Sequence, residues 1–163
     1  YGISAFGLSK QLDISPKEAK EIIEQYFARF SKIRAFMTSC IEQARDKGYV
    51  QTPAGRRIMI DGISEKNAIR RQAAERVAIN APVQGMAADI MKKAMVTLAS
   101  EILQKQQDID LVMQVHDELV FEVDAQQVAH YAQLVVALME KVIALSVPLI
   151  AVAGVGENWD EAH

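Results

Sequence analysis

The sequence predicts an α+β fold for its 163 residues, built as one continuous structural unit. Apolar residues recur at helical spacing between residues 16 and 44 and again after residue 128. Two short β-rich runs, 111–115 and 119–123, lie between these helical segments, and no linker or low-complexity tract interrupts the chain. Half of the residues are hydrophobic and 24% are charged, so a sizeable core is available and a disordered chain is excluded.

Two amphipathic helices are expected first. Ser15 and Glu18 have the spacing of a capping box, and Pro16 stands at the first helical position. The apolar residues that follow share one helix face: Ala19, Ile22, Ile23, Tyr26, Phe27 and Phe30. A second apolar series over 33–44 repeats this spacing until Gly48 provides a stop signal. We expect the two helices to form a helical hairpin.

A small hairpin and a long helical region are expected next. The β-rich run between 49 and 60 is interrupted by Pro53-Ala54-Gly55, which predicts a turn with Arg56 and Arg57 just beyond it. Residues 65–105 are rich in Ala, Met, Gln, Arg and Lys and contain few turn residues, which predicts a long helical region. Pro82 and Gly85 should kink this region or split it in two.

The remaining segments predict a second hairpin, a helix and a last strand. The runs 111–115 and 119–123 flank a polar tip, so they indicate a tight β-hairpin. Asp124 and Gln127 resemble another capping box at the start of a helix whose apolar face runs to Val142. Residues 148–155 are then expected to form the final strand.

The charge is unevenly distributed, although the net charge is only −3. Segment 45–93 contains ten Lys and Arg against five Asp and Glu, whereas 94–163 contains two against eleven. A basic middle and an acidic end suggest a polyanion and metal cations as partners, while solvated faces of unequal sign explain the charges about as well. The single cysteine, Cys40, excludes a disulfide scaffold and favours a reducing, cytoplasmic location.

The tip of the second predicted hairpin, His116-Asp117-Glu118, carries three ionisable groups. Mg²⁺ binds one or two carboxylates together with substrate phosphates and water, and a two-metal displacement at phosphorus needs at least two carboxylates. Adjacent strand residues point to opposite faces, so Glu118 joins Asp117 at one centre only if the turn twists them together. A polar hairpin turn without any metal explains the pair as well.

Arg76, Asn80 and Gln84 follow one another at intervals of four residues in the long helical region, which predicts a polar stripe. These side chains donate hydrogen bonds to minor-groove acceptors, which are nearly the same for every base pair. A solvated helix face is the alternative. The clustered basic residues are compatible with phosphate contacts: Arg56, Arg57, Arg70, Arg71, Lys92 and Lys93.

Several of these segments together resemble the family-A DNA polymerases, in collinear order from Tyr1 to His163. Residues 114–120, Gln-Val-His-Asp-Glu-Leu-Val, resemble the third signature of the family. The other segments resemble, in turn, the end of the fingers helix signature, the Thr-x-x-Gly-Arg-Arg turn, the helix that faces the nascent base pair and the extreme C-terminus: 1–8, 52–57, 80–85 and 156–160.

The resemblance implies a small antiparallel palm sheet with a catalytic β-hairpin, packed with several amphipathic helices and a long kinked helical region. Residues 1–48 would be helices derived from the fingers, and 49–163 a palm-associated region that carries the carboxylate hairpin 111–123. We therefore expect a C-terminal part of a larger polymerase.

The implied activity is template-directed DNA synthesis in replication and repair, by nucleotidyl transfer from a dNTP to a primer 3′-hydroxyl with two Mg²⁺ ions. Asp117 would hold the metal ions with Glu118 as a supporting acid and further ligand, and His116 would lie near the primer terminus. The stripe residues would contact the minor groove of the primer–template DNA. Tyr1 would line the pocket for the nucleotide and the templating base.

The sequence departs from the family pattern in two ways. The first palm signature, with the second catalytic aspartate, has no counterpart here, and neither have the fingers Arg and Lys that hold the triphosphate. Met86 stands where the family usually has threonine. We expect the chain to be inactive by itself, to have no membrane contact and to self-associate through the sheet edge of 111–123. A non-catalytic duplex-binding module and a metal-dependent phosphohydrolase are the alternatives.

Overall fold

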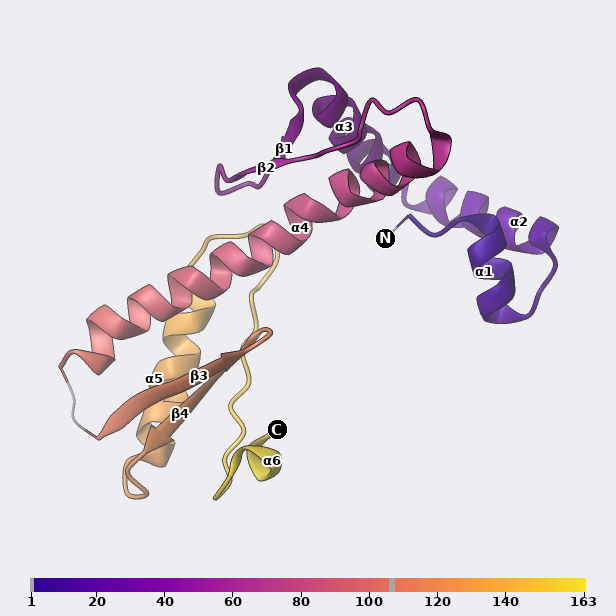
Figure 1. Cartoon of the computed structure of the whole chain (residues 1–163). Coiled ribbons are helices and arrows are strands. Elements are labelled where there is room, and N and C mark those ends of the chain that lie inside the picture. The colour runs from indigo at the N-terminus through magenta and orange to yellow at the C-terminus, as the bar shows by residue number, and fades with distance from the viewer. Residues whose placement is uncertain (1, 106–107) are drawn as a thin grey trace. The chain divides into compact units, whose positions relative to one another are not determined.

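A computed structural model describes residues 2–105 and 108–163 of the chain. The fold consists of two compact units, Tyr1–Met86 and Ala87–His163, and the long helix α4 (Ala68–Leu98) contributes to both (Figure 1). The division falls inside a helix, where no linker composition marks it. A functional boundary after residue 48 stays a prediction.

Three helices begin the first unit: α1 (Ala5–Leu12), α2 (Pro16–Arg29) and α3 (Ser31–Lys47). The capping box of α2 is confirmed, since Glu18 N–H donates to Ser15 Oγ at 3.2 Å and Ser15 N–H donates to Glu18 Oε2 at 3.0 Å. Gly48 ends α3 with φ 75°, as predicted. Only Phe30 separates α2 from α3, which is shorter than the connection of a helical hairpin, and α2 packs against α1 instead.

The core of the first unit lies between α3, the small hairpin and the first half of α4. Strands β1 (Tyr49–Gln51) and β2 (Arg57–Met59) pair antiparallel, with Val50 opposite Ile58. The buried residues come from all these elements and the loop before α4: Cys40, Ala44, Val50, Ile60, Ile63, Ala74, Ala78 and Ala81. Small alanines on α4 let the hairpin approach the helix closely.

Helix α4 runs through Pro82 without a break, so of the two predicted outcomes the split does not occur, and the predicted long kinked helix is confirmed. Asn67 caps its start, because Asn67 Oδ1 accepts hydrogen bonds from the N–H groups of Ile69 and Arg70. A proline inside a helix costs about 3 kcal/mol. Pro82 is buried, and the neighbouring Ala78 and Ala81 belong to the core of the first unit.

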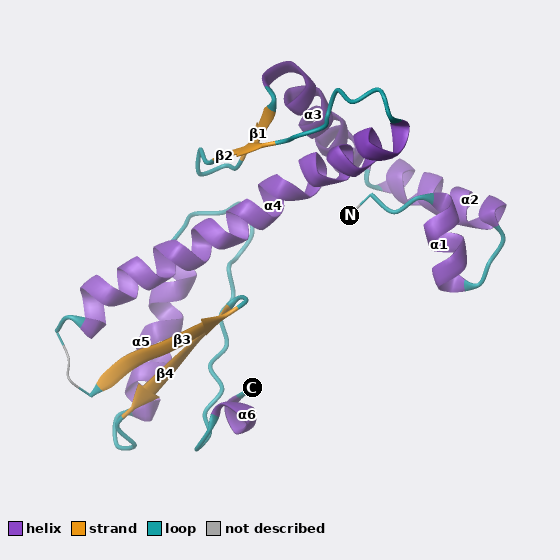
Figure 2. Cartoon of the chain, in the orientation of Figure 1, coloured by secondary structure: helices purple, strands orange, loops and turns teal. Residues whose placement is uncertain are grey.

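The second unit contains the carboxylate hairpin. A π-helical turn (Ala99–Leu103) follows α4, and the later elements are β3 (Ile109–Val115), β4 (Glu118–Val123), α5 (Val128–Lys141) and α6 (Trp159–Ala162) (Figure 2). Leu98, Ile102, Ile109 and Tyr131 form the buried centre. Apolar side chains of β4 and α5 pack around it: Leu119, Phe121, Val123, Leu134, Val135, Leu138 and Met139.

Two predictions fail in this unit. Asp124 does not cap a helix, because its Oδ1 accepts the N–H of Gln126 at 2.8 Å in a local turn, and α5 begins only at Val128. Residues 148–155 form no strand, since no described strand pairs with them. No helix within the described ranges is long and apolar enough to cross a membrane.

Candidate active site and nucleic-acid interface

The tip of the β3–β4 hairpin is a two-residue connection made by His116 and Asp117. Val115 lies opposite Glu118 in the register, so Glu118 is the first residue of β4. His116 has φ 50°, the left-handed conformation that tight hairpin turns require and that is uncommon for a residue with a side chain. Gln114 Nε2 donates to the His116 carbonyl at 3.1 Å and holds the turn. Backbone geometry therefore projects the predicted acidic residues at the end of the hairpin, whose register is continuous from Met113 to the tip and irregular between Leu111 and Met113.

The two carboxylates of the tip have different surroundings. Asp117 is exposed and makes no hydrogen bond or ion pair with any residue that the structure describes. Glu118 is half-buried, and its Oε1 lies 2.9 Å from Nδ1 of His163. The hairpin thus presents one unengaged carboxylate and one held by a contact from the end of the chain.

The carboxylates of the hairpin tip supply part of the ligands that a hard cation such as Mg²⁺ requires. Asp117 and Glu118 offer oxygen ligands, which Mg²⁺ prefers, and one or two carboxylates are the usual protein share of a magnesium site completed by phosphates and water. Across residues 2–105 and 108–163, no three His, Cys, Asp or Glu side chains gather as a metal site. The tip is therefore compatible with half of a two-metal site, and a phosphohydrolase centre lacks its further ligands in the described chain.

The predicted polar stripe lies on the first-unit part of α4. Arg76 and Gln84 are exposed, and Asn80 is half-buried. Each step of four residues turns about 40° around a helix, so the three side chains share one side of α4. The chain start passes close to this stripe, because a Cβ at Gly2 would lie 3.2 Å from Arg76 Cγ. Tyr1, the predicted pocket residue, lies outside the described residues.

Gly85 brings the β1–β2 hairpin against α4 directly beside Gln84. A Cβ at Gly85 would lie 2.7 Å from Thr52 Cγ2 and 2.8 Å from Ile58 Cδ1, so only glycine permits this approach. Arg56 lies in the hairpin turn and Arg57 begins β2 directly after it. Thr52 N–H donates to the Arg56 carbonyl at 2.9 Å, and Arg56 N–H donates to Thr52 Oγ1 at 3.2 Å, so these two bonds close the turn. The structure therefore brings the predicted turn arginines and one end of the stripe onto neighbouring elements, a juxtaposition that sequence analysis missed.

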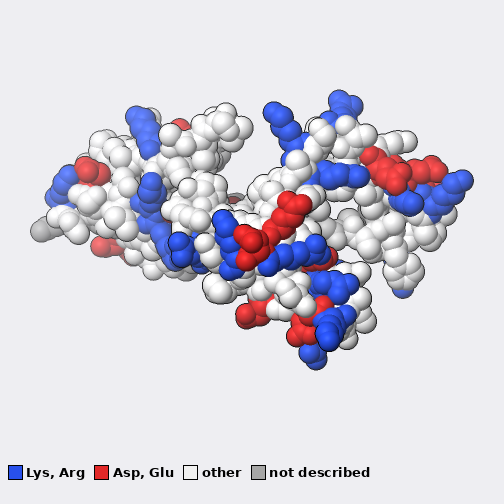
Figure 3. All heavy atoms as spheres, turned by 90° about the horizontal axis from the view of Figure 1, so that it is seen from above, with Lys and Arg blue, Asp and Glu red and all other residues white. Residues whose placement is uncertain are grey.

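The basic residues have individual roles. The Arg57 guanidinium lies 5.0 Å from the centre of the Tyr49 ring, and Arg71 donates to the carbonyls of Glu65 and Lys66 before α4. Arg70, Lys92 and Lys93 are exposed. On the face drawn in Figure 3, basic side chains form several separate groups interspersed with acidic ones. On this face the basic side chains therefore offer several separate points for phosphate contacts.

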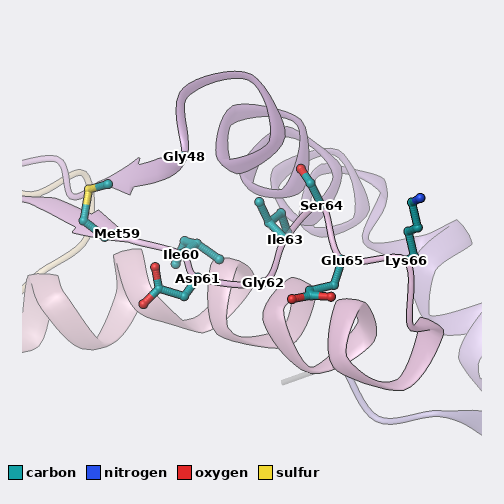
Figure 4. A pocket seen from close by; sticks show the side chains of 9 residues that line it. All are labelled: Gly48, Met59, Ile60, Asp61, Gly62, Ile63, Ser64, Glu65 and Lys66. Carbon is teal, nitrogen blue, oxygen red and sulfur yellow. The ribbon is translucent and has the colours of Figure 1, made fainter.

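One open hollow of the first unit lies apart from the predicted site residues. Gly48 and residues 59–66 line it, with the acidic side chains Asp61 and Glu65 at its wall (Figure 4). None of the residues predicted for metal or DNA binding belongs to it. The candidate residues lie instead on two exposed surfaces, the hairpin tip of the second unit and one side of α4 in the first unit.

These features define a class of protein: an α+β chain that presents two adjacent carboxylates at the tip of a β-hairpin. The family model described as DNA polymerase family A matches residues 1–161. DNA polymerase I of Pseudomonas aeruginosa is 48% identical over 163 residues, which is 100% of this chain and 18% of that protein. DNA polymerase I of Streptococcus pneumoniae strain TIGR4 is 47% identical over 162 residues, covering 99% of this chain and 18% of the relative.

The structural comparison agrees with the sequence comparison. The POL domain of Pol1 from M. smegmatis, solved in complex with DNA primer-template and dNTP, matches 99% of this chain and 29% of its own with 44% identity and a TM-score of 0.94. The chain belongs to DNA polymerase family A. It spans 18% of the length of the first two curated relatives.

Proposed function

We propose that the protein containing this chain is a DNA-directed DNA polymerase that acts in replication and repair. It would transfer a nucleotidyl group from a dNTP to a primer 3′-hydroxyl and release pyrophosphate. The observation that carries the proposal is the match of residues 1–161 to the polymerase family together with the exposed Asp117 at the hairpin tip. The similar solved structure holds primer-template and dNTP, which supports these partners.

Asp117 and Glu118 are the residues of this chain proposed to bind Mg²⁺. Bound metal would activate the primer hydroxyl and stabilise charge on the transferring phosphate. Asp117 would contribute its unengaged carboxylate, Glu118 its second oxygen, and His116 would lie near the primer terminus. A further aspartate from the rest of the polymerase is required, so we expect this chain alone not to incorporate nucleotides.

The helix stripe is proposed to hold the primer end. Arg76, Asn80 and Gln84 would donate hydrogen bonds to minor-groove acceptors that all base pairs share, and so would bind a duplex without reading its sequence. Arg56 and Arg57 would contact phosphates from the adjacent hairpin turn, and Tyr1 would line the nucleotide and template pocket. The buried free thiol of Cys40 supports a reducing, cytoplasmic location.

The test replaces the exposed carboxylate in the full-length protein. Asp117→Asn should reduce primer extension by several orders of magnitude and leave primer–template binding nearly unchanged, because a metal ligand is lost while the DNA contacts stay. Glu118→Gln should have a smaller effect. Extension is measured by single-turnover incorporation at matched Mg²⁺, and binding by fluorescence anisotropy.

Asp110→Asn is the matched control, since Asp110 is an exposed aspartate on the same hairpin. It should extend primers at the wild-type rate. A rate for Asp117→Asn within about tenfold of wild type, which is only about 1.4 kcal/mol of barrier, contradicts the metal assignment. DNA binding by the wild-type protein without Mg²⁺-dependent extension would identify a duplex-binding module instead.

A further inference from the structure

The contact between His163 and Glu118 joins the end of the chain to the carboxylate hairpin. His163 Nδ1 lies 2.9 Å from Glu118 Oε1, within ion-pair distance of the carboxylate, and Glu118 follows Asp117 directly. Two forms of His163 can donate from Nδ1 to this carboxylate: the protonated imidazolium and the neutral tautomer that carries its hydrogen on Nδ1. The contact engages Oε1 of Glu118, and Oε2 has no hydrogen bond or ion pair with any residue that the structure describes.

Local bonds stabilise the C-terminal helix that directly precedes His163. Asn158 caps α6, because its Oδ1 accepts the N–H of Glu161 at 3.1 Å, and Glu161 in turn accepts the N–H of Glu157 at 3.1 Å. The ring of Trp159 lies 5.8 Å from the His163 ring, measured between centroids. His163 therefore directly follows a capped helical turn and lies beside the ring of Trp159.

The segment before α6 anchors this turn to the rest of the unit. Ala151 N–H donates to Glu140 Oε1 of α5 at 3.1 Å. Any side chain at Gly154 would collide with the backbone of Ala162, and one at Gly156 would lie 2.6 Å from Glu161 Cβ, so both glycines allow the chain to pack tightly on α6. We name residues 149–163 the C-terminal strap.

We propose that His163 is a positioning residue that holds the Glu118 carboxylate for cation binding beside Asp117, an inference that rests on the proposed function. Without the bond, Glu118 at an exposed tip samples several rotamers, and ordering it on cation binding costs entropy. Partners that orient a metal-binding carboxylate by hydrogen bonds commonly affect metal affinity or activity when they are removed.

The test compares His163→Ala with His163→Gln in the full-length polymerase. His163→Ala should raise the cation concentration for half-saturation about threefold to tenfold, because the pair is partly exposed and its effect lies at or below the lower end for supporting ligands. His163→Gln keeps a side-chain donor and should restore much of the loss. Bound Mn²⁺ is measured from the free Mn²⁺ EPR signal, with a dideoxy-terminated primer–template and the matching dNTP present.

His130→Ala is the control for losing a histidine, since His130 is exposed on α5 and contacts the Tyr131 ring. It should leave the Mn²⁺ midpoint unchanged. A purely structural role of His163 would lower the active fraction at every cation concentration without moving the midpoint. An unmoved midpoint for His163→Ala therefore overturns the proposal.

A double-mutant cycle with Glu118→Ala tests whether His163 acts through Glu118. In that background His163→Ala should have no further effect on the midpoint, because the partner is already absent. A full effect there would mean that His163 acts on something else, which also overturns the inference. A wild-type protein that fails to extend primers would contradict the proposed function, while the Mn²⁺ midpoint would still decide the role of His163.

Discussion

Arg76 and Gln84 are the exposed donors of the α4 stripe, and their loss should weaken binding to the primer end. A hydrogen bond of this kind contributes about 0.5–1.5 kcal/mol, so Arg76→Ala or Gln84→Ala in the full-length protein should raise the dissociation constant roughly twofold to tenfold. The loss should be the same for all correctly paired ends, because they share minor-groove acceptors. Anisotropy titrations with primer ends of different sequence measure it.

Gln133→Ala on α5 removes an equally exposed glutamine and should not change binding. Mismatched ends displace the shared acceptors and should respond differently from paired ends. Strong discrimination by both stripe variants among correctly paired ends would contradict the groove interpretation.

At the residue scale, the sequence predicts which side chains belong to the site but not which contacts hold them. A polar tip between two apolar runs is a local signal for the hairpin turn, and the resemblance of 114–120 to the family signature predicts Asp117 and Glu118 as site residues. Nothing in the local pattern of His163 indicates that it reaches Glu118, since that contact depends on the whole path of the C-terminal strap. The close approach at Gly85 is likewise a tertiary contact, although the glycine inside a helical pattern is a visible signal for it.

Among the elements, the β1–β2 hairpin depends on Gly85 for its position on α4. Gly85→Ala should push the hairpin away, since overpacking costs about 1–3 kcal/mol while alanine regains only about 1 kcal/mol of helix propensity. The Thr52 amide should exchange faster with solvent. If Arg56 and Arg57 bind phosphates, the plot of the logarithm of the DNA-binding constant against the logarithm of salt concentration should become less steep. The slope should change by about one unit for each phosphate that the displaced turn no longer reaches.

The double variant Gly85→Ala/Thr52→Ser removes the methyl group that the new side chain meets and should recover part of the loss. Hydrogen exchange and salt titrations of the full-length protein measure both effects. Unchanged exchange at Thr52 in Gly85→Ala would show that the hairpin does not need this close approach.

Helix α5 is linked to the start of β3 by a bond that depends on pH. Tyr131 OH donates to Asp108 Oδ1 at 2.7 Å, and this hydrogen bond, with burial, raises the pKa of Tyr131 to about 12. The folded state holds the phenol proton more tightly than the unfolded state, so the stabilisation is complete below about pH 10 and is lost as the pH rises through about 12.

Tyr131→Phe should therefore lower the midpoint temperature of thermal unfolding at pH 8. As the pH rises from about 10 to 12, this midpoint should fall less in the variant than in the wild-type protein. The chain has four tyrosines, so absorbance at 295 nm should also show one late ionisation step that disappears in this variant. A tyrosine titration that is identical in the two proteins would contradict the raised pKa.

The elements that the sequence predicts correctly are those with local signals. Ser15 caps α2 because Pro16 sets the first helical position, whereas the similar pattern at Asp124 fails because a short acceptor side chain can bond two residues ahead instead. Pro82 is a local signal for a kink or a split, and the helix is kinked but continuous through it. Residues 148–155 have strand composition, yet a strand needs a partner, and the described chain offers none.

At the scale of the whole chain, two features should govern self-association in solution. These are the acidic charge of residues 94–163 and the outer edges of the β3–β4 sheet, which pair with no other described strand. Within the described residues this sheet has only two strands, and Val112 and Met113 on β3 are 56% and 38% exposed. The segment between α5 and α6 carries further exposed apolar residues: Val147, Ile150, Val152 and Val155. Unpaired edges with apolar side chains tend to pair with another copy.

We expect the 163-residue chain by itself to form dimers or larger species through this edge, to bind duplex DNA weakly and to incorporate no nucleotide. Salt should act in opposite directions on the two interactions. It screens phosphate contacts and weakens DNA binding, whereas it screens repulsion between acidic copies and strengthens self-association.

Val112→Lys places a charge on the edge strand and should favour the monomer, as edge lysines do in natural sheets. Light scattering at low and high salt measures the mass, and a stable wild-type monomer at high concentration would contradict the exposed edge. Mg²⁺-dependent incorporation by the chain alone would contradict an incomplete site, because Asp117 and Glu118 would then suffice without a further aspartate.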